Sequence, residues 1–99
     1  MSFVITQPDA LTSAAGDLTG IGAAMSSLNA AVASPTTSLA PAAADDVSAL
    51  TAAAFAAQGA MYQEAGARAA AIHQMFVTTL QASACSYAAT EAANVTVTR

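Results

Sequence analysis

The positions of the three prolines constrain the fold of this chain more than any other feature of its sequence. Pro8 lies near the start, Pro35 and Pro41 lie close together, and no proline follows Val47. Proline removes a backbone donor and clashes with the preceding helical turn, so it interrupts a helix interior. The sequence therefore predicts helices over about 8–36 and about 45–86, joined by a proline corner at about 35–44.

The first of these stretches has the pattern of an amphipathic helix. Thr6 is the expected N-cap, Pro8 is tolerated in the first turn, and Asp9 is the acid of a capping box. Beyond it, apolar residues recur at alternating spacings of three and four, which is a heptad pattern. These residues are Leu11, Ala14, Leu18, Ile21, Met25, Leu28 and Val32.

The second stretch predicts a longer helix with an aromatic band. Asp45 or Asp46 is the expected cap, because a carboxylate there accepts from the first free N–H groups and complements the helix dipole. At 100° per residue, six side chains fall within a band about 60° wide. They are Phe55, Tyr62, Ala69, Phe76, Leu80 and Tyr87. The β-branched end, "NVTVTR", is expected to fray.

Two long helices and one corner predict an all-α fold, an antiparallel two-helix hairpin. A hairpin has a single mutual seam, so apolar side chains on its other faces remain open for an interface. Two interpretations are equally supported at this point: the chain folds against a different protein, or it forms a homodimeric bundle. The expected partner interface is Leu11, Leu18, Ile21, Met25, Leu28, Phe55, Tyr62, Ile72, Phe76 and Leu80.

Composition argues against several classes of function. Charged residues make up 8% of the chain, and its net charge is -4. With so few basic residues, no patch is available to neutralise nucleic-acid phosphates or anionic lipid. "MSFVITQPD" lacks the basic region of a secretory signal peptide, so this N-terminus is expected to be retained.

The residues that could carry chemistry are isolated from one another. His73 is the single histidine and has no second ligand at metal-site spacing, so it is expected in a core or interface. Cys85, the single cysteine, has no cation one turn away and is expected to be a buried or half-buried thiol. The sequence predicts no enzyme, no metal site and no cofactor.

Tyr87 and Glu91 form a separate polar feature near the C-terminal end. Their i, i+4 spacing places the ring and the carboxylate on one face of a helix. Such a patch can be recognised by a receptor. In the simpler interpretation Tyr87 only ends the aromatic band and Glu91 solubilises the last turn.

Taken in order, five segments resemble the PE (Pro-Glu) domain of mycobacterial proteins. These segments are "FVITQPDAL", "AAGDLTGIG", "ASPTTSLAPAAADDVSAL", "MYQEAGARAAAIHQMFVTTL" and "YAATEAAN", and together they cover nearly the whole chain. The dipeptide that names the family is Pro-Glu, whereas this chain has Pro8-Asp9. Aspartate keeps the negative charge of the first turn, so the same fold is expected.

The resemblance implies a stand-alone PE domain spanning residues 1–99, with a non-enzymatic role. PE domains pair with a Pro-Pro-Glu (PPE) protein in a four-helix bundle, and the heterodimer is exported by a type VII (ESX) secretion system. The family's Tyr-x-x-x-acid secretion signal matches Tyr87 and Glu91, in a tail expected at about 87–99. A cytosolic chaperone is expected to contact the PPE partner only.

The expected location is the cell envelope or the culture medium, after assembly in the cytosol. The alternative function is a helical protein that acts on a membrane or on the cell envelope after export. The shortage of basic residues weighs against this alternative.

Overall fold

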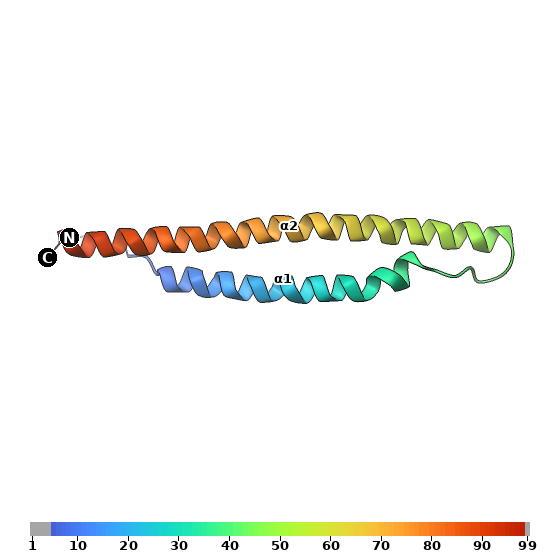
Figure 1. Cartoon of the computed structure of the whole chain (residues 1–99), viewed down its shortest axis with the longest axis horizontal. Coiled ribbons are helices and arrows are strands. Elements are labelled where there is room, and N and C mark those ends of the chain that lie inside the picture. Colours follow the sequence, from blue (N-terminus) through green and yellow to red (C-terminus); the bar gives the residue numbers. More distant parts are fainter. Residues whose placement is uncertain (1–4, 99) are drawn as a thin grey trace. The chain divides into compact units, whose positions relative to one another are not determined.

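The computed structural model describes residues 5–98, which form the helices α1 (Pro8–Thr37) and α2 (Asp46–Val97) and the loop 38–45 between them (Figure 1). The chain divides into two compact units. Within the described residues, the terminal unit combines 5–21 with 73–98, and the loop unit is Gly22–Ile72. Both helices pass through both units, so each unit holds an antiparallel pair of helical segments. The predicted all-α antiparallel hairpin is confirmed.

At the start of α1 the backbone of Gln7, and not the Thr6 side chain, closes the first turn. The Gln7 carbonyl accepts from the N–H groups of Ala10 at 3.0 Å and Leu11 at 3.4 Å. The capping role predicted for Thr6 is wrong, because an N-cap hydroxyl must lie directly before the first turn and Thr6 is one residue too early. Its hydroxyl instead donates to Glu91. Pro8 begins the helix and Asp9 lies exposed in the first turn.

Pro35 lies inside the last turn of α1, which continues to Thr37. Threonine hydroxyls supply donors near the position where proline has no N–H. Thr36 Oγ1 donates to the Val32 carbonyl and Thr37 Oγ1 to the Ala33 carbonyl, each at 2.7 Å. Pro35 lacks the N–H that would bond to the Ala31 carbonyl four residues earlier, so these side-chain bonds reinforce the last turn of α1 and do not replace the missing one.

Asp45 is the N-cap of α2, one of the two aspartates predicted for this role. Its carboxylate accepts from the Ser48 backbone N–H at 2.7 Å and from the Ser48 hydroxyl at 3.0 Å. The Ser48 N–H, which favours the ionised carboxylate, is the main cause that lowers the pKa of Asp45 below its ordinary value.

At its other end α2 extends to Val97, well beyond the predicted end near residue 86. Tyr87 and Glu91 therefore lie within the helix and not in a tail that follows it. The segment after Val77 contains neither glycine nor proline, and its β-branched residues cost only a few tenths of a kcal/mol each. Thr96 Oγ1 also bonds back to the Ala92 carbonyl at 3.2 Å.

The core of the terminal unit is small. Ala15 of α1 and Val77 and Ala84 of α2 are its buried residues, with at most 2% of each exposed. Leucines Leu11, Leu18 and Leu80 are half-buried around them. Such small side chains allow the two backbones to approach closely but bury little apolar area, so the stabilisation from this core is modest.

In the loop unit the seam is made of still smaller and more polar residues. Gly59 is buried against the end of α1, where an added Cβ would lie 2.5 Å from the Thr36 carbonyl oxygen. Only glycine fits this contact. On either side of Gly59 the seam of α2 continues with half-buried Ala52, Ala56, Gln63 and Gly66.

Candidate functional site

Most of the predicted partner interface is open to solvent. Seven of its ten side chains are exposed by at least half: Ile21, Met25, Leu28, Phe55, Tyr62, Ile72 and Phe76. The other three, Leu11, Leu18 and Leu80, are half-buried in the terminal unit. The large apolar residues of this chain therefore lie mainly outside its own helix–helix seam, where a partner can reach them.

In the loop unit these exposed side chains lie on one side of the helix pair. On a helical wheel, an apolar side chain lies about 50–80° before the residues of the same helix that face the other helix. This holds for Met25 and Val32 on α1 and for Phe55 and Tyr62 on α2. Equivalent offsets on two antiparallel helices fall on the same side, as e positions do in an antiparallel coiled coil. The loop unit therefore presents a continuous apolar face formed by both helices.

The same geometry recurs in the terminal unit. Ile21 on α1 and Phe76 on α2 precede the residues that face the other helix by about 70–90°, in the same sense. Ile21 and Phe76 therefore define an apolar face within the terminal unit. Each unit thus has an apolar side contributed by both helices.

Asn29 links the two helices in the loop unit, a role that the apolar pattern did not indicate. Its side-chain oxygen accepts from the Tyr62 hydroxyl at 2.7 Å, and its backbone carbonyl accepts from Gln63 Nε2 at 2.9 Å. Tyr62 therefore has a fixed polar end and an exposed ring. The recurrence of Gln63 with Gly59 and Gly66 at alternating spacings of four and three is the signal that could have identified this seam.

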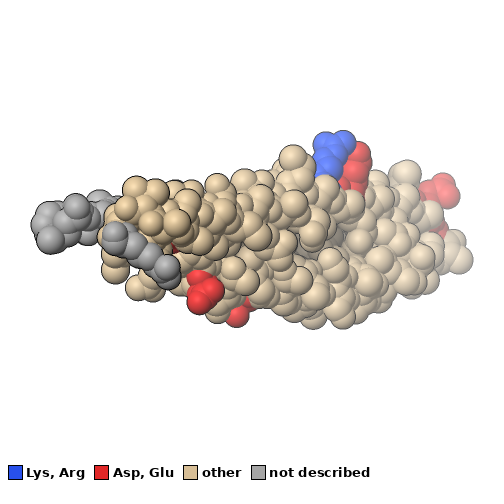
Figure 2. Space-filling model, turned by 60° about the vertical axis from the view of Figure 1, so that its left-hand side comes forward, with Lys and Arg blue, Asp and Glu red and all other residues tan. Residues whose placement is uncertain are grey.

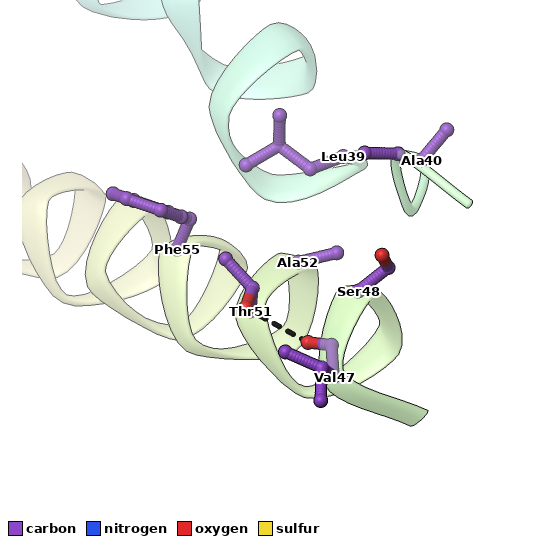
Figure 3. A pocket seen from close by; sticks show the side chains of 8 residues that line it. Leu39, Ala40, Val47, Ser48, Thr51, Ala52 and Phe55 are labelled. Atoms are coloured by element: carbon purple, nitrogen blue, oxygen red, sulfur yellow. Dashed lines mark hydrogen bonds between the residues drawn. The ribbon is translucent and has the colours of Figure 1, made fainter. Parts of the chain in front are cut away.

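A shallow hollow of about 210 Å³ lies where the loop meets the first turns of α2 (Figure 3). Leu39 borders it from the loop and Phe55 from α2. Its two hydroxyls are already engaged, since Thr51 Oγ1 donates to the Val47 carbonyl at 2.8 Å and Ser48 Oγ donates to Asp45. The hollow can hold an apolar side chain, and it offers no free nucleophile.

His73 belongs to the seam of the terminal unit. Its Nε2 lies 2.6 Å from the Leu18 carbonyl oxygen, which can only accept, so Nε2 carries the proton. This places His73 in the helix–helix contact, in line with the predicted core or interface position. Cys85, in contrast, is exposed, and its predicted burial is wrong. Ala84 occupies the seam position, and the next residue points about 100° away from it.

Tyr87 and Glu91 lie one turn apart on α2. Tyr87 is 48% exposed and Glu91 is half-buried. Thr6 Oγ1 donates to Glu91 Oε1 at 3.2 Å, a contact that the sequence did not predict. The patch thus presents an aromatic hydroxyl and a carboxylate, one oxygen of which is held by the segment before α1.

Charge is sparse over the part of the surface that Figure 2 shows, most of which is uncharged. Arg68 pairs with Glu64 at 2.7 Å within α2, and both side chains are largely exposed. Within residues 5–98, no group of three or more His, Cys, Asp or Glu side chains could hold a metal ion. Over the same residues, neither helix has the combination of length and hydropathy that crossing a membrane requires.

Residues 4–94 match the model of the PE family. Over 94 residues the chain is 62% identical to "PE family protein PE13" of Mycobacterium tuberculosis, covering 95% of each sequence. It is 56% identical to "PE family protein PE8" of the same species, but spans only 34% of that protein. "PE cleavage protein A" is 52% identical over 92 residues, which are 16% of its length. The chain belongs to the PE family.

Proposed function

We propose that this PE protein pairs with a PPE-family protein in a four-helix bundle and that a type VII secretion system exports the heterodimer. In this proposal the protein is a binding partner and not an enzyme. Tyr87 and Glu91 act as the export signal, and the cytosolic chaperone contacts the PPE partner only. Assembly takes place in the cytosol, and export delivers the pair to the cell envelope or the medium.

The observation that carries the proposal is the inverted distribution of apolar residues. The buried residues between α1 and α2 are alanine, glycine and one valine, and the leucines beside them are only half-buried, while Ile21, Phe55 and Phe76 lie exposed. A hairpin that formed its bundle alone would bury its largest apolar side chains first, because burial of each contributes about 1.5–3 kcal/mol. Membership of the PE family favours a PPE protein as the partner that covers them.

The direct test is co-expression with a PPE-family protein. We expect an affinity-tagged PPE protein to co-purify the PE chain at equal stoichiometry, and the pair to elute as a heterodimer. A stable homodimer of the PE chain that does not bind the PPE protein would contradict the proposal.

A liposome flotation assay tests the membrane-active alternative. The proposal expects the purified heterodimer to remain at the bottom of the gradient, because its apolar faces are covered. Flotation of the heterodimer with vesicles would favour the alternative function.

A further inference from the structure

The hydroxyl of Thr6 reaches the carboxylate of Glu91 across nearly the entire length of the sequence. The two residues are separated by 85 positions, both are half-buried, and the distance from Oγ1 to Oε1 is 3.2 Å. Both belong to the terminal unit. Thr6 precedes α1, so this bond is a contact of the entering chain segment with α2 and not a contact between helix faces.

We infer that Thr6 is a positioning residue of the patch formed by Tyr87 and Glu91. The inference rests on the proposed function, since it concerns how the export signal is presented. A glutamate side chain has three rotatable torsions, and ordering it on binding costs free energy. A hydrogen bond from Thr6 restricts the Glu91 carboxylate before any receptor arrives, which lowers that cost.

The bond orients the Glu91 carboxylate and still leaves acceptor positions on it for a receptor. An ionised carboxylate has about four acceptor positions, and Thr6 occupies one of them on Oε1. Oε2 remains available to a receptor donor, and the Tyr87 ring is 48% exposed beside it. The three side chains therefore form a composite patch drawn from both ends of the chain.

A consequence is that the patch is complete only in the folded hairpin. Tyr87 and Glu91 come together in any helix that contains them, because their spacing is local. Thr6 joins them only when α1 has packed against α2. Export would then discriminate a folded chain from one in which only α2 is helical.

The test compares Thr6→Val, which removes the hydroxyl but keeps the shape, with Thr6→Ser, which keeps the hydroxyl. Both are made in the full chain, co-expressed with the PPE protein in a mycobacterial host. The measurement is the exported fraction of the complex, from blots of cell pellet, envelope and medium. We expect Thr6→Val to lower this fraction by roughly threefold to tenfold, the range for the loss of one typical hydrogen bond. Thr6→Ser should restore it.

Glu91→Ala is measured in parallel as the variant that removes the carboxylate itself. Wild-type export of Thr6→Val, alongside blocked export of Glu91→Ala, would overturn the role of Thr6 and leave the proposed signal intact. Normal export of Glu91→Ala would overturn the signal itself, and the inference with it. Increased export of Thr6→Val would also overturn the inference, because the bond from Thr6 would then hinder recognition of Glu91. A lower yield of intracellular complex for Thr6→Val would reduce Thr6 to a folding contact.

Discussion

At the scale of individual residues, the proposed export depends most on Tyr87 and Glu91. Tyr87→Ala and Glu91→Ala should each leave the heterodimer assembled in the cytosol and stop its export. The physical reason is that both side chains are partly accessible near one end of α2, so a receptor can contact them without unfolding the protein. The measurement is a fractionation blot combined with co-purification of the PPE partner.

Tyr87→Phe separates recognition of the hydroxyl from packing of the ring. If Tyr87 only packs, the phenylalanine variant is harmless, and Tyr87→Ala lowers the melting temperature and the yield of complex together. Normal export of both alanine variants would reject the signal.

Phe76 tests the apolar face of the terminal unit. Phe76→Asp should abolish the heterodimer, because an unpaired carboxylate buried in an interface costs several kcal/mol. Gln74→Asp is the matched control: it adds the same charge at an exposed position that the helical wheel places roughly opposite Phe76 on α2. The measurement is pull-down of each variant by tagged PPE protein. Equal recovery of the two variants would show that Phe76 lies outside the interface.

At the scale of the helices, α1 is weakened by two glycines whose positions have room for a side chain. A Cβ added at Gly16 or Gly20 would meet no atom within 4 Å, and both positions face away from α2. Gly16→Ala and Gly20→Ala should therefore each stabilise the complex, by about 1 kcal/mol from helix propensity. Thermal melts of the heterodimer measure the effect.

The same substitution, glycine to alanine, is expected to destabilise the protein at Gly59. Gly59→Ala should lower the melting temperature, because its Cβ would collide with the Thr36 carbonyl oxygen, a backbone atom that cannot rotate away. A stabilising Gly59→Ala would mean that α1 and α2 approach less closely than this contact requires.

The N-cap of α2 should make stability depend on acid pH. Bonding to Ser48 lowers the pKa of Asp45 below its ordinary value of 3.8. The carboxylate therefore binds a proton less readily in the folded chain, so its stabilisation is present above that value and is lost as pH falls through the folded pKa. Asn also caps helices but does not ionise. Below about pH 4, the melting temperature of wild type should therefore fall relative to Asp45→Asn. Parallel pH profiles would contradict this assignment.

At the scale of the whole chain, the exposed apolar faces predict dependence on a partner. The buried core consists of alanine, glycine and one valine, while most of the large apolar residues are exposed. Purified alone, the chain should bind a hydrophobic dye and self-associate, and co-expression with the PPE protein should remove both properties. A monomeric chain that melts cooperatively by itself would contradict this expectation.

The sequence by itself determined the features that depend on local chemistry. The prolines confined the break to one segment, Asp45 supplied a side chain suited to cap α2, and the spacing of Tyr87 and Glu91 placed them on one helix face. Residues within one turn of each other decide these features, so no tertiary information is needed. The end of α2 was misjudged for a related reason, since small propensity differences near a terminus do not specify where a helix stops.

Only the tertiary structure decided which faces of the helices meet. Apolar periodicity identifies the most hydrophobic face, whereas the residues buried between α1 and α2 are Ala15, Val77, Ala84 and Gly59, because close backbone approach excludes larger side chains there. The Asn29 link and the bond from Thr6 to Glu91 join residues that are far apart in sequence, and no local pattern encodes such a pairing. Most of the largest apolar residues of this chain point outward. Their periodicity in the sequence therefore indicates the surface that is available to a partner more than the contact between α1 and α2.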